Sequence, residues 1–281
     1  MTDFLYISHN FGKEGIGQLE KFLRDKDLMA VAHYDKYSIT AGLCSIRLPL
    51  NDLRIDSFIQ EIEKTGNKPF IRLDREYSKT ELNSFEYLVL NIRTVGLDNP
   101  GKKQKYNFSN SCEECGAGVE PISPLIIPIN SMGKKLIDFT AHNNWLIFRK
   151  EIAEKTITKK FSGISFHPVI IGRNVDNFLW GKIDNIIPKL NTKSKIRFNE
   201  AKCNTCINSG NFTNFETETA FIYPKNLRSS FKDYNLTNEF FGEWKYSKMG
   251  GGRLVIVNQK VRQFLMQEKV KNLDFEPIEF I

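Results

Sequence analysis

The sequence predicts an α+β protein in two parts. An N-terminal α/β sandwich-like domain covers residues 1–100, and in residues 101–281 a strand–helix–strand unit occurs twice around a four-cysteine zinc site. Three observations predict this arrangement. Strand-like and helix-like hydrophobic patterns alternate through the first hundred residues. A later stretch of the chain matches an earlier one without a gap. Two C-x-x-C pairs precede the two matching stretches.

The first hundred residues alternate between strand and helix patterns. Runs rich in aromatic, β-branched and other apolar residues predict strands at residues 3–8, 38–50, 70–73 and 85–95. Apolar residues at helical spacing predict two amphipathic helices, carried by Ile16, Leu19, Phe22 and Leu23 and by Ile55, Phe58, Ile59 and Ile62. This order places both helices on one face of a sheet. The Gly-, Pro-, Lys- and Asn-rich residues 96–111 connect the two domains.

The composition is typical of a globular protein. Of 281 residues, 41% are hydrophobic and 26% are charged, and no apolar run approaches the roughly 18 residues of a membrane span. The formal net charge of +7 suits nucleic acid or an acidic protein partner. The lysines are scattered, however, and the runs at residues 102–105 and 159–160 are too short for a nucleic-acid arm. The chain does not open on a secretory signal, so we expect a cytoplasmic protein without membrane contact.

Four of the five cysteines form two C-x-x-C pairs, Cys112 with Cys115 and Cys203 with Cys206, while Cys44 stands alone. Such a turn holds two thiolates at the separation that a tetrahedral metal ion needs, and zinc is the usual occupant. Four thiolates complete the coordination sphere, so the predicted Zn²⁺ is structural. Disulfides, a redox pair and an empty site are the alternatives. A cytosolic chain disfavours disulfides, and the first pair follows a polar loop instead of opening a helix as a redox pair does.

Two stretches of the second half match at a fixed offset. Residues 145–170 match residues 254–278, and the sequence Phe-x-Pro at 166–168 recurs 109 positions later without a gap. Each stretch reads strand, helix, turn, strand, and each follows a cysteine pair. The second pair is followed by a longer spacing, which predicts an insertion within residues 208–252. We therefore expect a pseudo-symmetric pair in which each copy gives two thiolates to one ion. The alternative is coincidence between two generic strand–helix–strand segments.

Together these residues resemble the double-CXXCG-motif family, immunity proteins of bacterial polymorphic toxin systems. The resemblance is carried by Cys112-Glu-Glu-Cys115-Gly116, the Phe-x-Pro strand, the second cysteine pair and the closing stretch, and covers about residues 112–281. It implies a protein that binds and neutralises a cognate toxin by protein–protein interaction. In the second motif Ile207 stands where the family has glycine, which loosens the turn but removes no ligand. The first hundred residues extend beyond the match.

An immunity protein needs a binding surface and no catalytic site, so the four cysteines are the predicted site residues. A candidate surface is the stretch 208–252, because aromatic residues mixed with Lys and Arg are typical of binding hot spots. The alternative is that most of these rings pack inside the second copy. The ten aromatic residues are Phe212, Phe215, Phe221, Tyr223, Phe231, Tyr234, Phe240, Phe241, Trp244 and Tyr246.

Two other functions were weighed against immunity. A nucleic-acid-binding zinc ribbon suits the basic composition, but the first cysteine pair has acidic neighbours, Glu113, Glu114 and Glu120. An enzyme is not expected, because Asp138 and His142, the nearest approach to a catalytic pair, lie outside any motif of that kind. The sequence therefore favours a zinc-stabilised binding protein, with nucleic acid an unlikely partner.

Overall fold

The computed structural model describes most of the chain, and the protein forms two compact units. The described residues are 2–38, 41–64, 70–92, 104–114, 116–127, 135–140, 145–171, 177–194, 209–210, 221–241 and 252–281. The N-terminal unit ends at Glu81 and the C-terminal unit begins at Leu82, inside the short helix α3 (Lys79–Ser84). No helix in the described ranges is long and apolar enough to cross a membrane.

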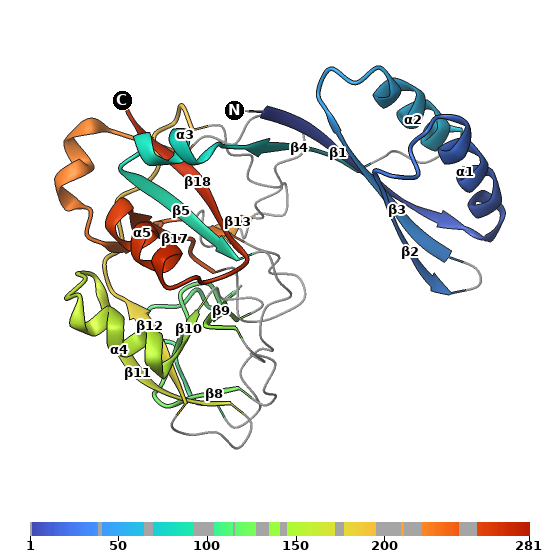
Figure 1. Ribbon diagram of the computed structural model, residues 1–281. Coiled ribbons are helices and arrows are strands. Elements are labelled where there is room, and N and C mark those ends of the chain that lie inside the picture. The colour runs from blue at the N-terminus through green and yellow to red at the C-terminus, as the bar shows by residue number, and fades with distance from the viewer. Residues whose placement is uncertain are drawn as a thin grey trace. The chain divides into compact units, whose positions relative to one another are not determined.

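The N-terminal unit is a four-stranded antiparallel sheet with two helices on one face (Figure 1). Its elements are β1 (Thr2–Gly12), α1 (Lys13–Asp25), β2 (Ala32–Ser38), β3 (Ala41–Pro49), α2 (Arg54–Glu63) and β4 (Phe70–Glu76). The strands lie in the order β2-β3-β1-β4, which is the arrangement of a split β-α-β fold. The α+β class and the placement of both helices on one face are thus confirmed. The sequence did not predict β2, because charged residues interrupt its apolar pattern.

A single core holds these helices to the sheet. Leu19 and Leu23 of α1 and Phe58 of α2 are fully buried against Ile7 and Ile46 of the central strands. Burying side chains of this size stabilises a fold by about 1.5–3 kcal/mol each. Helix α1 ends at Asp25, and Asp27, two residues later, adopts a positive φ of 52°.

The C-terminal unit contains two five-stranded sheets of the same design. The copy-1 sheet has the order β8-β11-β12-β10-β9 and the copy-2 sheet the order β14-β18-β5-β17-β15. The copy-1 elements are β8 (Leu125–Ile127), β9 (Ile137–Phe139), β10 (Leu146–Arg149), α4 (Lys150–Thr158), β11 (Ile164–Ile171) and β12 (Phe178–Ile183). The copy-2 elements are β5 (Tyr87–Ile92), β14 (Phe221–Tyr223), η1 (Lys225–Ser230), β15 (Tyr234–Leu236), β17 (Val255–Asn258), α5 (Gln259–Gln267) and β18 (Leu273–Phe280). Two short pairs, β6 (Tyr106–Asn107) with β7 (Glu120–Pro121) and β13 (Ser209–Gly210) with β16 (Phe240–Phe241), complete the unit.

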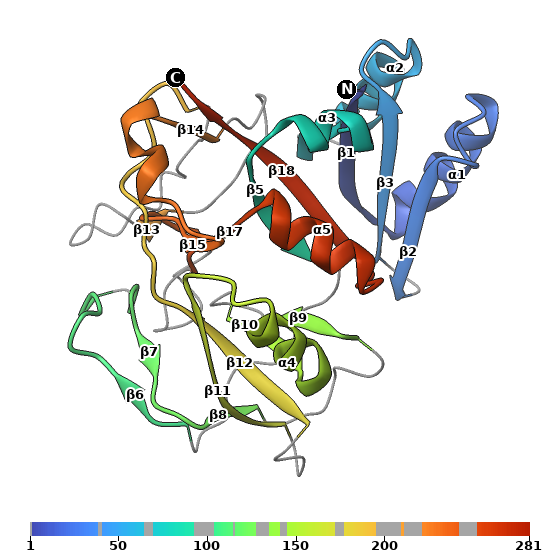
Figure 2. The same cartoon turned by 60° about the vertical axis from the view of Figure 1, so that its left-hand side comes forward.

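The predicted duplication is present element by element. Strand β10, helix α4 and strand β11 each begin and end 109 residues before β17, α5 and β18. Even the turn after each helix is repeated, since Gly163 and Asn272, also 109 apart, both adopt a positive φ. Figure 2 shows α4 and α5 lying on their respective sheets. The match in sequence therefore reflects a match in structure.

The central strand of each sheet comes from a different place in the chain. In copy 1 it is β12, which follows β11 directly, whereas in copy 2 it is β5, which precedes both copies. The register is nevertheless the same: Leu146 of β10 pairs with Gly181, and its counterpart Val255 of β17 pairs with Leu90. Pairing with β11 and β18 repeats in the same way. The predicted strand at 85–95 thus belongs to the C-terminal unit, and not to an N-terminal domain ending at residue 100.

Among its described residues, the C-terminal unit has three hydrophobic clusters. One core is shared by the helix-covered faces of both sheets and includes Leu146 and Phe148 of copy 1 with Val255 and Val257 of copy 2. The opposite faces have separate cores. Most of the predicted aromatic surface lies in these interiors or is otherwise buried. The buried rings are Phe221, Tyr223, Phe231, Tyr234, Phe240 and Phe241. For these six residues the packing alternative is confirmed, and the exposed hot spot was wrong; the other four lie outside the described residues.

Candidate metal centre and seam cavity

Cys112 lies in a tight loop between β6 and β7; the segment 104–122, of which residue 115 lies outside the described residues, is here called the cysteine loop. The backbone N–H of Cys112 donates to the carbonyl oxygen of Ala117 at 2.8 Å, and the N–H of Gly116 donates back to the carbonyl oxygen of Cys112, also at 2.8 Å. Gly116 has a φ of 71°, a conformation that glycine adopts without strain. These bonds fold the loop back on itself immediately after the C-x-x-C sequence.

The four-cysteine zinc site stays a prediction. Cys112 is half-buried, while Cys115, Cys203 and Cys206 lie outside the described residues. Within the described ranges, no three His, Cys, Asp or Glu side chains gather closely enough to hold a metal ion. The turn around Cys112 fits a thiolate ligand, and zinc held there would supply a cross-link and no chemistry. Cys44 is of another kind, because burial in the N-terminal core raises the pKa of its thiol to about 12 and keeps it protonated.

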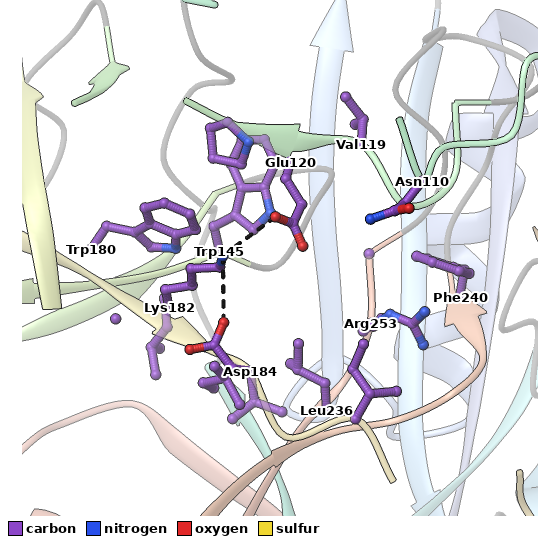
Figure 3. Close-up of a pocket in the computed structure, with 18 residues that line it drawn as sticks. Asn110, Val119, Glu120, Trp145, Trp180, Lys182, Asp184, Leu236, Phe240 and Arg253 are labelled. Carbon is purple, nitrogen blue, oxygen red and sulfur yellow. Dashed lines mark ion pairs between the residues drawn. The ribbon is translucent and has the colours of Figure 1, made fainter. Parts of the chain in front are cut away.

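A cavity of about 340 Å³ lies where the cysteine loop and the two copies meet (Figure 3). We call it the seam cavity. Its walls come from the cysteine loop, from the start of β10 and the end of β12 in copy 1, and from β15, β16 and β17 in copy 2. Leu146 and its counterpart Val255 both line it. The register of the two sheets therefore fixes the positions of many of its side chains.

Aromatic rings line much of this cavity. Trp145 and Trp180 have ring centroids 6.3 Å apart, and Trp145 lies 6.5 Å from the ring of Tyr106 in the cysteine loop. On the wall from copy 2, the guanidinium of Arg253 lies over the ring of Phe240, 4.0 Å from its centroid. Two tryptophans from copy 1 and a phenylalanine and an arginine from copy 2 thus line one space.

Three charged groups form a chain at one end of the cavity. The ammonium of Lys182 lies 3.4 Å from a carboxylate oxygen of Glu120 and 3.4 Å from one of Asp184 (Figure 3). Burial lowers the pKa of Lys182, but the two carboxylates outweigh burial and the net shift is upward. The side chains of Glu120 and Asp184 are 50% and 62% exposed, so a molecule in solution can reach them.

Arg253 is held by backbone carbonyls. Its guanidinium donates to the carbonyl oxygen of Thr237 at 2.7 Å and to that of Asn238. Burial lowers its pKa, and the carboxylates of Glu239 and Glu120 oppose this shift. An arginine remains charged under such conditions, so the cavity contains two cations and two carboxylates.

Of the two residues weighed as catalytic, Asp138 has structural contacts. The carboxylate of Asp138 is buried, accepts the N–H of Phe139 and pairs with Lys135 at 2.6 Å; His142 lies outside the described residues. A second grouping, not predicted from sequence, places Ser165 Oγ 3.2 Å from His167 Nε2 and 3.4 Å from Asp184 Oδ2. Here the carboxylate meets the serine and not the imidazole, which is the wrong order for a serine-hydrolase triad.

Sequence reasoning missed the seam cavity because its walls are distant in the chain. Trp145 stands in the matched stretch, and Arg253 follows the glycine run at 250–252, but no local pattern joins them. A scan of family models, a search of curated proteins and a search of solved structures found no match to the chain. The resemblance to double-CXXCG immunity proteins is therefore carried by the residues quoted for it and stays a prediction.

Proposed function

We propose that this protein is an immunity protein that binds a cognate toxin, with the C-terminal unit as its scaffold. The observation that carries the proposal is the seam cavity. Trp, Tyr and Arg dominate the binding energy of protein interfaces, and here two tryptophans and an arginine line a single hollow. No catalytic grouping is required of such a protein, because neutralisation follows from stoichiometric binding.

The scaffold suits this role because the cavity side chains stand on or beside strands of fixed register. Trp180 and Lys182 belong to β12, and Leu236 belongs to β15. A binding site built on regular elements is more precise than one on loops. The predicted zinc ion would hold the cysteine loop, which forms one wall. Its contribution is therefore to the shape of the cavity and not to contact with the toxin.

The alternative, a nucleic-acid-binding zinc ribbon, receives less support. Glu113 and Glu114 of the cysteine loop are exposed where a ribbon that reads phosphates usually carries Lys or Arg. In the N-terminal sheet, the guanidinium of Arg47 lies 3.9 Å from the centroid of the Phe4 ring, which occupies a ring face that a base would need for stacking. Binding to DNA or RNA that weakens steeply with salt would reverse this preference.

The test is protection by co-expression with the product of the neighbouring gene. Ile186→Glu places a charge at the rim of the cavity, where Ile186 is 48% exposed. Ile157→Glu on α4 is the matched control, because Ile157 is 54% exposed and does not line the cavity. We expect the wild type and Ile157→Glu to protect and to co-purify with the toxin, and Ile186→Glu to bind about 30-fold more weakly, as for a hot-spot position. Failure of the wild type to protect or to form a complex would refute the proposal.

A further inference from the structure

We infer that the seam cavity receives a neutral aromatic side chain with a hydrogen-bond donor, a tyrosine or a tryptophan, from the protein partner. The inference rests on the proposed function for the source of that side chain. This bound side chain is called the guest below. Its chemistry follows from the size of the cavity, from the aromatic rings that line it and from its balance of charge.

The size and the apolar walls require a large guest. A cavity of about 340 Å³ exceeds the volume of any single side chain and falls in the range of ligand sites, so it also admits the backbone that carries the side chain. Leu236, Ile186 and Val255 line this space together with the three aromatic rings. A flat ring buries the largest apolar area here and adds edge-to-face contacts with Trp145 and Phe240.

The charges at the cavity exclude a charged guest. For a lysine or an arginine, repulsion by Lys182 and Arg253 offsets attraction by Glu120 and Asp184, and for a carboxylate the signs are reversed, so neither recovers the free energy of hydration lost on burial. With two groups of each sign, the cavity has no net attraction for an ion. A neutral guest therefore encounters the smallest electrostatic cost.

The long distances in the ion pairs of Lys182 favour a guest that carries a hydrogen-bond donor. Lys182 lies 3.4 Å from each of its two carboxylates, whereas Lys135 and Asp138 approach to 2.6 Å. A filled cavity would displace the water that now completes the solvation of Glu120 and Asp184. The O–H of tyrosine or the N–H of tryptophan replaces one of those hydrogen bonds, while phenylalanine or leucine does not.

The surroundings of the cavity fit a protein guest. Phe108, Ile122 and Ile186 are apolar and about half exposed. Phe108 lies 6.0 Å from the ring of Tyr106, which in turn contacts Trp145, so the ring contacts continue from the exposed cysteine loop into the cavity. Such a rim excludes water around a central anchor in protein interfaces.

Tryptophan emission offers a direct test on the full-length protein. Two of the three tryptophans, Trp145 and Trp180, line the cavity, and a Trp244→Phe background removes the third. The probes are N-acetyltyrosinamide, N-acetylphenylalaninamide, N-acetylleucinamide and N-acetylargininamide, with excitation where tyrosine does not absorb. We expect the tyrosine probe to change the emission with a Kd of order 1 mM, about tenfold tighter than the phenylalanine probe.

Matched variants locate the binding. Ile186→Phe narrows the rim and should weaken the tyrosine probe about tenfold, while Ile157→Phe, equally exposed on α4, should leave it unchanged. Glu120→Gln with Asp184→Asn should reduce the preference for tyrosine over phenylalanine to about twofold. Equal affinity for the tyrosine and phenylalanine probes, tightest binding of the arginine probe, or no response to any probe would each overturn the inference.

These experiments distinguish failure of the inference about the aromatic guest, the anchor, from failure of the proposed immunity function. If the toxin binds an Ile186→Phe protein as tightly as the wild type, the anchor inference fails and the immunity proposal stands. If the tyrosine probe binds as expected but co-expression gives no protection, the cavity chemistry stands and the proposed function fails.

Discussion

The copy-1 and copy-2 sheets have one architecture but are completed from different directions. In copy 1 the chain passes from β11 straight into the central strand β12, whereas the centre of copy 2 is β5, laid down before either copy begins. Pairing register is nevertheless identical around both central strands. The register is therefore set by which faces are buried, and not by the order in which the strands are connected.

The two copies also differ in the contacts that their helices make. Ala153 of α4 corresponds to Arg262 of α5, a buried arginine that donates to Asn83 Oδ1 at 2.7 Å. The neighbouring Gln259 donates through its backbone N–H to the carbonyl oxygen of Glu86 at 3.0 Å. The backbone bond is repeated in copy 1, where Lys150 of α4 donates its N–H to the carbonyl oxygen of Asn177 just before β12, also at 3.0 Å. Copy 2 adds the side-chain bond of Arg262, which Ala153 in α4 cannot make.

The largest effect is expected from removing β5. A chain that starts at Leu82 should fold its two sheets, whereas a chain that starts at Gln104 should lose the copy-2 sheet. Three adjacent residues of β5, Leu88, Val89 and Leu90, are almost wholly buried, and their loss alone approaches a typical net stability of about 5–15 kcal/mol. Circular dichroism and denaturant unfolding measure the outcome. If a peptide of residues 82–92 restores folding of the shorter chain, β5 acts by pairing as a strand. If both truncated chains fold equally well, β5 is not the central strand of the copy-2 sheet.

The cysteine pairs test whether the two copies share one ion. We expect one zinc per chain by elemental analysis. Cys115→Ser in the first pair and Cys206→Ser in the second should each remove the metal and lower Tm by about 5–10 °C, because both break the same structural site. Two ions per chain, or a variant that leaves metal content and Tm unchanged, would mean that the pairs do not form one site.

The repeated turn gives a smaller and asymmetric effect. Gly163 has a φ of 86°, and a Cβ there would collide with the carbonyl oxygen of Tyr234, so Gly163→Ala should cost about 2–4 kcal/mol of unfolding free energy. Its counterpart Asn272 has a φ of 61°, which asparagine tolerates, and Asn272→Gly should change stability by about 0.5 kcal/mol or less. Urea unfolding compares the two. A similar cost for both would show that the turns are equivalent in energy as well as in shape.

The smallest effect is a pH dependence due to Asp233, a residue of copy 2. Asp233 stands where copy 1 has Leu136, and its carboxylate accepts the N–H of Ser162 at 2.7 Å and the side-chain amide of Asn258 at 2.6 Å. Burial raises the pKa of Asp233, but these hydrogen bonds outweigh burial and the net shift is downward.

A carboxyl with a lowered folded pKa stabilises the fold above its unfolded pKa, about 3.9, and loses that contribution as pH falls through the folded value. Asp233→Asn should therefore be less stable than the wild type near neutral pH, and the two unfolding curves should converge in acid. A constant difference between them at every pH would assign the effect to packing.

The sequence predicted the repeat well because its signal is local. The Phe-x-Pro strands and the helix spacing recur at one offset, and the elements follow them to the residue. The central strand of copy 2 escaped prediction because nothing in residues 85–95 says which later strands they will pair with. Buried strands of either unit show the same apolar run, so a boundary at residue 100 and one at Glu81 look alike in the sequence.

The candidate site was even harder to predict, because it too depends on contacts between distant parts of the chain. Cysteine spacing predicts ligands because two thiolates in one turn are a local feature. The seam cavity depends on Trp145, Lys182 and Arg253, which meet only after both sheets have formed. The aromatic stretch misled for a related reason: Phe221 and Tyr223 occupy the places of Leu125 and Ile127 in copy 1, so they are core residues of a larger size.

The early position of β5 has a consequence for biosynthesis. A ribosome produces Tyr87–Ile92 well before β17 and β18, and the whole of copy 1 is completed in between. During that interval an apolar strand has none of its native sheet partners, and pairing across so long a stretch of chain is slow. Nascent chains halted after β12 should therefore bind chaperones through residues 87–92 and should be cleaved there by added protease. Once translation has passed Phe280, chaperone binding and protease cleavage at residues 87–92 should both cease, because only then can the copy-2 sheet enclose its central strand.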